Sequence, residues 1–384
     1  MKKFFAFAAF AALTLAGMTS CSNDDEIEQG VNKPAKMESG AIGFNVRQDG
    51  VIATRGTATT AANFLDQIND FQVFGYYNNG DGRYVGSSDV VGIVIDGDGA
   101  GAWDYHTASQ VQYWPANSLD FQAITPSADA SFSLANTPVS GSPRLTANVT
   151  VPTTVTNQKD IMFASATDVN NAASGAAVGL TFKHALSQVV FAGKVANPTI
   201  TAVVSEITVC NVHNTGNVGY RSAVSTLDAA ATGDAESNFS VGLIEGADAA
   251  ATTAARTMTS TTAQNLTNGN GALMMIPQSQ TAWTHAAPEK AIANATGSYL
   301  KVKCTVTDNN SSTVLINDDY VYIPLDLTTV EWELGKKYTY TLVFGNGSGG
   351  YDENGDPLTS MVPITYTVVA ADDWTPVDAG SIEF

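Results

Sequence analysis

Basic residues are scarce in this chain, whose 384 residues include 18 lysines and arginines against 37 acidic residues, a formal net charge of −19. Nucleic acids and anionic membrane surfaces are polyanions, so this charge argues against both as partners. The four histidines are scattered without metal-ligand spacing, and His184, in an apolar strand-like phrase, is predicted to be a satisfied core residue. No G-x-S-x-G or P-loop pattern occurs. The sequence therefore predicts a protein that is not an enzyme and holds no metal or cofactor.

The first 20 residues predict export. Lys2 and Lys3 precede an uncharged, largely apolar run from Phe4 to Gly17, which is too short to span a bilayer as a mature helix. The following Met18-Thr19-Ser20-Cys21 resembles a bacterial lipobox, with cleavage before Cys21 and acylation of its thiol. An ordinary signal peptide with a chance cysteine is the alternative. No later segment has the pattern of a transmembrane helix, so membrane contact is expected through the lipid alone.

Cysteine is almost absent from the rest of the chain. Besides Cys21, only Cys210 and Cys304 occur. Both lie in the second half, and in an oxidising compartment they could form a disulfide. Two separately buried thiols are the other reading.

Short strands separated by turns are the dominant pattern after residue 64. One such strand, Phe71–Tyr77, is followed by the turn signal Asn78-Asn79-Gly80-Asp81-Gly82. Another, Tyr338–Phe344, alternates large apolar residues with smaller or polar ones. Hydrophobic residues make up 44% of the chain, enough for real cores. Without its first 20 residues the chain keeps 384 − 20 = 364, which at about 150 residues a domain suggests two domains. The sequence predicts an all-β sandwich fold.

Several phrases, taken together and in this order, resemble the fimbrillin family, the major-subunit family of type V pili. They are Tyr113-Trp114-Pro115, Leu119–Pro126, Asp160–Ala164, Thr181–Ser187, Leu273–Gln278, Trp332–Tyr340 and Asp373-Trp374. The resemblance implies two transthyretin-like β-sandwich domains in tandem, residues 56–196 and 197–384. A lipoprotein signal peptide at residues 1–20 and a tether with a removable strand at residues 21–55 would precede them.

The removable strand is expected around residues 42–46. Ile42, Phe44 and Val46 alternate with small or polar residues, which is the period of two of a half-buried strand. Arg55-Gly56 then offers a flexible site for an Arg-specific protease. Cleavage there would release both the lipid anchor and the strand. Arg47 is the second candidate, although its neighbour Gln48 fits the family pattern less well, and a solvated loop arginine is the remaining reading of Arg55.

A donor strand is expected near the C-terminus, because the resemblance implies assembly by donor-strand exchange. Val362, Ile364, Tyr366 and Val368 share one face of a predicted strand and could fill a vacated groove in another subunit. At about 2 kcal/mol for each large side chain, four anchors contribute on the order of 8 kcal/mol, against about 6 for the three of the lost strand. An ordinary last strand of its own domain is the alternative.

The expected partners are other copies of the chain or related fimbrial subunits, an Arg-specific protease, and the outer membrane through the lipid before cleavage. The expected location is the outer membrane or cell surface, in a fimbria that serves adhesion. One alternative is a lipid-retained anchor or accessory subunit. Another is a surface glycan-binding lipoprotein, for which Trp103, Tyr105 and Tyr113 could supply an exposed aromatic platform, although these residues also fit a core. The acidic segment 352–356 resembles a calcium loop in part but lacks the EF-hand pattern, so a plain turn is predicted.

Arg55→Ala tests the processing site. We expect the variant to stay a lipidated monomer, since the strand would not leave its groove. Arg47→Ala is the matched control and should polymerise as the unaltered chain does. SDS-resistant ladders and the N-terminal residue of surface material report the result, and normal ladders from Arg55→Ala would contradict the prediction.

Overall fold

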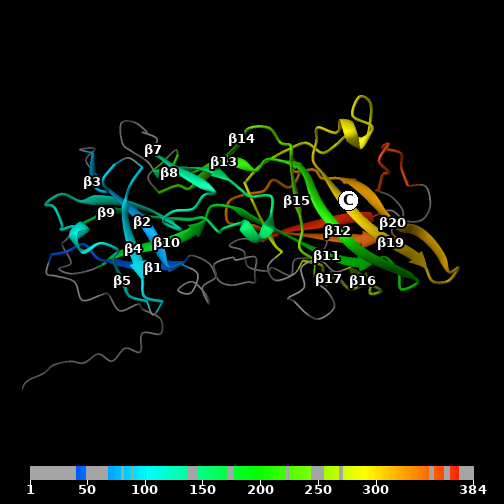
Figure 1. Ribbon diagram of the computed structural model, residues 1–384, viewed down its shortest axis with the longest axis horizontal. Helices are drawn as coiled ribbons and strands as arrows, with labels where there is room; N and C mark the ends of the chain where they lie inside the picture. Colours follow the sequence, from blue (N-terminus) through cyan, green and yellow to red (C-terminus); the bar gives the residue numbers. More distant parts are fainter. Residues whose placement is uncertain are drawn as a thin grey trace, which may run out of the picture. The chain divides into compact units, whose positions relative to one another are not determined.

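Strands form nearly all the regular structure in this computed structural model, which describes residues 40–48, 68–78, 82–88, 90–99, 101–136, 145–170, 177–221, 223, 225–243, 255–267, 271–345, 350–358 and 364–371. Three 3-10 turns are the only helical elements in these ranges: η1 (Ala108–Gln110), η2 (Val155–Asn157) and η3 (Ile292–Asn294). None of the helical segments described has the length and apolar character needed to cross a membrane. The predicted all-β sandwich class is confirmed (Figure 1).

The first sheet has eight strands in the order β1-β10-β9-β6-β2-β4-β5, with β3 paired to β2 (Figure 1). Its members are β1 (Phe44–Gln48), β2 (Asp70–Tyr77), β3 (Arg83–Val85), β4 (Ile93–Gly97), β5 (Trp103–Tyr105), β6 (Leu119–Thr125), β9 (Met162–Val169) and β10 (Val178–His184). β1 runs parallel to β10, whereas the other neighbours in this sheet are antiparallel. The first strand of the described residues therefore lies at one end of the sheet.

A four-stranded sheet, β14-β13-β8-β7, packs on one face of the first sheet. It consists of β7 (Phe132–Asn136), β8 (Leu145–Thr150), β13 (Thr215–Gly219) and β14 (Asp228–Thr232). Leu145 and Val149 of β8 share a hydrophobic core with Phe74 and Phe163 of the larger sheet. The Leu145 N–H also donates to Gln122 Oε1 at 2.7 Å, which satisfies a buried amide between the two layers.

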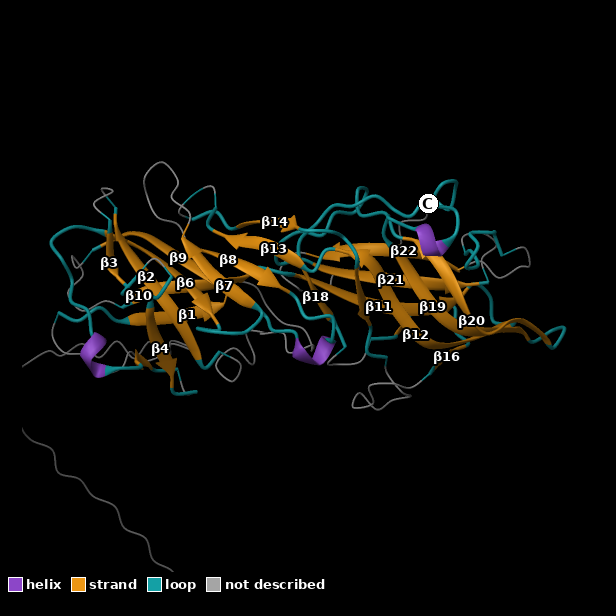
Figure 2. Ribbon diagram, turned by 45° about the horizontal axis from the view of Figure 1, so that its top comes forward, coloured by secondary structure: helices purple, strands orange, loops and turns teal. Residues whose placement is uncertain are grey.

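Two five-stranded sheets complete the fold (Figure 2). One has the order β17-β11-β21-β22 with β18 paired to β11, and the other has the order β15-β12-β19-β20 with β16 paired to β12. Their strands are β11 (Ser187–Val195), β12 (Ile200–Val212), β15 (Ser237–Ser240), β16 (Arg256–Met258), β17 (Gln264–Asn265), β18 (Leu273–Met275), β19 (Tyr299–Asp308), β20 (Thr313–Pro324), β21 (Lys337–Phe344) and β22 (Ile364–Ala371).

Alternation explains how these sheets face each other. In β19, Leu300, Val302, Cys304 and Val306 are buried, while the residues between them are partly exposed. Successive side chains of a strand point to opposite faces, so this pattern gives one apolar face and one polar face. The apolar face joins the same hydrophobic core as Leu145 and Phe163, which also holds Tyr340 of β21.

Sheet membership crosses the predicted domain boundary at residues 196 and 197. β11 precedes it and pairs with β18 and β21, whereas β13 and β14 follow it and pair with β8 or with each other. The tandem division into residues 56–196 and 197–384 therefore stays a prediction.

The two cysteines of the described residues are separate buried thiols. In the antiparallel β12–β19 pair, Cys304 lies opposite Val204, and Cys210 lies 210 − 204 = 6 residues further along, opposite Tyr299. Six strand residues span roughly 20 Å. A disulfide needs Cα atoms within about 7 Å, so these thiols do not form one.

Burial raises the pKa of both thiols from an ordinary 9.0 to about 12. Since the thiolate is the reactive form, neither cysteine should react with Ellman's reagent at pH 8 in the folded chain, and both should react in urea. A Cys21→Ser variant removes the third thiol from the measurement. Rapid release of two equivalents of thionitrobenzoate without urea would show that the thiols are accessible.

Candidate functional site

β1 is an edge strand whose backbone pairs with β10, while the residues just before it bond to the segment 112–114. It pairs with β10 in parallel, with Phe44 opposite Val178. The Val178 N–H donates to the Gly43 carbonyl oxygen at 2.7 Å. On the other side, the Ile42 N–H donates to the Gln112 carbonyl oxygen at 2.8 Å. The strand thus bridges β10 and the segment 112–114.

Three side chains of β1 and the residues just before it point into a separate hydrophobic core, which we call the first core and which also holds Phe71 and Phe121. Ile42, Phe44 and Val46 are 0%, 2% and 3% exposed. The Phe44 ring packs edge-on against Phe71 and Phe121, with centroid distances of 5.8 and 5.9 Å. Such edge-to-face contacts add to the gain from burial. We call the space that these three side chains occupy, between β10, β5 and residues 112–114, the β1 slot.

Tyr105 of β5 closes the far side of the β1 slot. Its ring lies 6.3 Å from that of Phe44, and its hydroxyl donates to the Ile42 carbonyl oxygen at 2.8 Å. Burial raises the pKa of Tyr105 to about 12, so the hydroxyl stays protonated and remains a donor. The two end strands of the eight-stranded sheet, β1 and β5, are therefore in contact.

β10 depends on β1 for much of its pairing. The ladder between β10 and β9 covers only Lys183 and His184, whereas β1 pairs with Val178–Phe182. Loss of β1 would leave Val178–Phe182 of β10 without a paired strand on that side. It would also expose the apolar side chains that line the β1 slot. Such an edge is a template for another strand.

β22, near the C-terminus, is also at an edge (Figure 2). It runs antiparallel to β21, with Tyr366 opposite Leu342, and no further described strand pairs with it. Val368 is buried, and the Tyr366 ring is tilted against Tyr340 at 5.5 Å. The Tyr366 hydroxyl accepts a hydrogen bond from the Asp326 N–H at 3.3 Å.

The remaining predicted site residues are only partly covered by the structure. Cys21, Arg55, Gly56 and Val362 lie outside the described residues. For Ile364 the backbone is described, in its ladder with Phe344.

The aromatic platform of the glycan-binding alternative does not form, and two of its three rings take the core position that the sequence also allowed. Trp103 is 1% exposed and Tyr105 is 8% exposed, so both rings belong to the core, and Tyr113 alone is at the surface with 46%. A three-residue strand alternates faces, which puts residues 103 and 105 on the same, inward side.

The acidic segment 352–356 forms a plain turn, as predicted. Asp352 Oδ1 accepts from the N–H groups of Asn354 and Asp356 at 2.9 Å each. The Asp356 carboxylate pairs with Lys290 Nζ at 2.6 Å. Within the described ranges no cluster of three His, Cys, Asp or Glu side chains is arranged to hold a metal ion. His184 is a core residue, 3.0 Å from an Asp160 carboxylate oxygen, as predicted.

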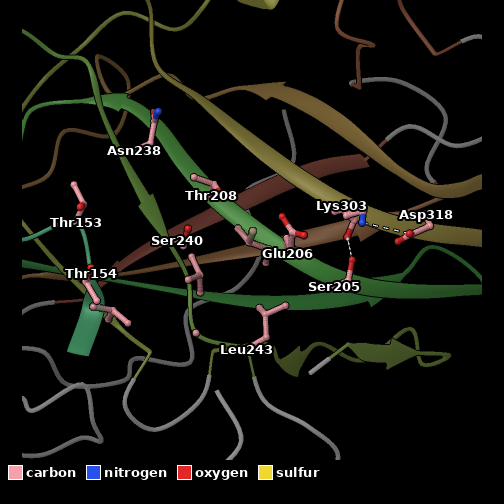
Figure 3. Close-up of a pocket in the computed structure, with 14 residues that line it drawn as sticks. Thr153, Thr154, Ser205, Glu206, Thr208, Asn238, Ser240, Leu243, Lys303 and Asp318 are labelled. Atoms are coloured by element: carbon pink, nitrogen blue, oxygen red, sulfur yellow. Dashed lines mark hydrogen bonds and ion pairs between the residues drawn. The ribbon is translucent and has the colours of Figure 1, made fainter. Parts of the chain in front are cut away.

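A pocket of about 690 Å³ lies over β12, where Figure 3 shows Glu206, Lys303 and Asp318 on its walls. Lys303 Nζ pairs with an Asp318 oxygen at 3.3 Å, and Glu206 accepts from the Tyr320 hydroxyl at 2.9 Å. The hydrogen bond and charge of Asp318 raise the pKa of Lys303, so the ammonium group stays charged. Lys303 and Asp318 thus pair with each other, and the Glu206 carboxylate is held by a hydroxyl of the same chain. Sequence reasoning missed this pocket, because its walls come from five separate segments.

Comparison with known proteins gives the family. A family model described as fimbrillin-like matches residues 54–362. A solved fimbrial protein from Bacteroides vulgatus is similar to this chain, with a TM-score of 0.55 and 15% identity over 87% of this chain and 99% of that one. That match shows a shared fold. The fimbrial anchor protein Mfa2 from Porphyromonas gingivalis also matches, with a TM-score of 0.34 and 8% identity over 87% of this chain and 97% of that one. Among curated protein sequences, none matches significantly.

Phe44→Ala tests how much β1 contributes to the uncleaved chain. The change removes a ring that is buried against several others, so the free energy of unfolding should fall by about 3–5 kcal/mol. Asn45→Ala, next to it on the partly exposed face, is the control and should cost within about 0.5 kcal/mol. Urea denaturation of the full chain measures both. Equal losses for the two variants would mean that the slot does not depend on this side chain.

Proposed function

Because this chain belongs to the fimbrillin-like family, whose model covers residues 54–362, we propose that it is a structural subunit of a cell-surface fimbria. The observation that supports this most is the edge strand β1, whose three apolar side chains complete the first core. A strand in that position can leave at the cost of one ladder, with β10, and of two backbone hydrogen bonds to the segment 112–114. A role in assembly needs no catalytic group.

Export and processing form the first part of the proposal. The precursor travels as a lipoprotein acylated at Cys21, and an Arg-specific protease cuts between Arg55 and Gly56. The segment that leaves includes β1 and the lipid. A mature chain of 384 − 55 = 329 residues remains, with an open β1 slot.

Strand exchange is the second part. β22 of one subunit leaves β21 and enters the β1 slot of the next, whether that neighbour is another copy or a related fimbrial subunit. Backbone pairing with β10 sets direction and register, and apolar side chains fill the pockets. In this scheme the two predicted domains, residues 56–196 and 197–384, have different roles, since the slot is in the first and the donor in the second.

The place of the chain within the fimbria depends on processing. A stalk subunit must lose β1, whereas an anchor or accessory subunit keeps its acylated Cys21. The N-terminal residue of material purified from the cell surface separates these roles. Gly56 would indicate a polymerising subunit, and an acylated Cys21 would indicate an anchor.

Deletion of residues 361–384 tests the donor. The truncated subunit lacks β22 but keeps the β1 slot, so we expect it to accept a donor and to pass none on. Alone, it should form no SDS-resistant ladder. Mixed with unaltered subunits, it should end growing chains and shorten the ladder.

The mixing arm separates a lost donor from a lost fold. A truncated chain that had failed to fold would leave the ladder of the unaltered subunits at its usual length. Normal ladders from the truncated subunit alone would show that residues 361–384 are not the donor.

A further inference from the structure

We propose that the C-terminal strand enters the β1 slot in one defined register, with Ile364 in place of Ile42, Tyr366 in place of Phe44 and Val368 in place of Val46. This inference rests on the strand exchange proposed above and adds the residue-by-residue fit. It assigns Tyr366 as the residue that determines the register.

The side-chain sequence of the two segments is the first argument. Residues 42–46 read Ile-Gly-Phe-Asn-Val, and residues 364–368 read Ile-Thr-Tyr-Thr-Val. Each places an aliphatic, an aromatic and a valine side chain at alternate positions, which is the spacing of one strand face.

The packing around Phe44 makes this pattern selective. Its ring meets Phe71, Phe121 and Tyr105 edge-on, so the position is shaped for an aromatic ring. A shift of two residues either way would put Ile364 or Val368 there and leave a cavity. It would also force Tyr366 into the place of Ile42 or Val46, where a larger group overpacks the core.

The backbone before the anchors supplies an independent argument. In this register Pro363 takes the place of Ala41. The hydrogen bonds around that position come from its neighbours, since the Ile42 N–H donates to the Gln112 carbonyl oxygen and the Gly40 carbonyl oxygen accepts from the Trp114 N–H. The Ala41 N–H donates to no residue that the structure describes. Proline, which has no N–H, therefore loses no hydrogen bond at that position.

Direction follows from β1 itself, which runs parallel to β10. A donor that keeps this direction places its residue 367 where Asn45 lies, opposite Gly179. Gly43, which is buried, receives a side chain in every register with the anchors facing inward, so it does not distinguish among them.

A pair of introduced cysteines tests the register of the donor strand on β10 directly. Gly179 is exposed, and a Cβ atom there meets nothing within 4 Å, so Gly179→Cys should be tolerated. Cells that make the fimbria are given two forms of the subunit, one with Gly179→Cys and one with Thr367→Cys. Directly opposed residues on paired strands have Cα atoms close enough for a disulfide. Mild oxidation of isolated fimbriae should then give a linked pair of subunits on a non-reducing gel.

Two further cysteine variants test the alternative registers. Thr365→Cys and Val369→Cys shift the tail cysteine by two residues, and neither should link to Gly179→Cys as efficiently as Thr367→Cys. Each single variant alone should give no link. Preferred linkage from residue 365 or 369 would overturn the register while it upholds strand exchange. Fimbriae that form with no link from any of the three positions would overturn the proposed exchange itself.

Discussion

The contact on which the rest of the assembly argument depends is the Phe44 ring within its cage of aromatic side chains. Phe71 comes from β2, Phe121 from β6 and Tyr105 from β5, so one side chain of β1 ties together three strands of the sheet. Its removal would open the core of the uncleaved chain from one edge. A core that is completed by an edge strand can be completed by a different strand of the same pattern, and this is the physical basis of the proposed polymer.

Local periodicity predicted the strand content well, because alternation of apolar residues is a property of consecutive positions. It placed Ile42, Phe44 and Val46 on one face, and these residues are buried. Periodicity does not predict which strands pair with one another. That β1 runs parallel to β10, about 130 residues later in the chain, depends on where the intervening strands are placed and not on the sequence of either segment.

Aromatic residues also show that the sequence pattern alone does not predict which side chains are buried. Trp103 and Tyr105 satisfy an exposed platform and a buried strand face equally well when only the sequence is read. The three-dimensional fold decides, and it closes both rings into the core against β1 and β2. The pocket over β12 was also invisible to sequence, since its polar side chains are separated by long stretches and share no motif.

Charge gives the last constraint. Copies of a chain with a formal charge of −19 repel one another, yet salt confines that repulsion to about 8 Å at physiological ionic strength. Association must therefore gain its free energy at short range. The segment 362–371 contains no charged residue, and the slot it is proposed to enter is lined by apolar rings and backbone groups. An interface of this kind depends on shape and hydrogen bonding, so subunits that share a strongly acidic surface can still join end to end.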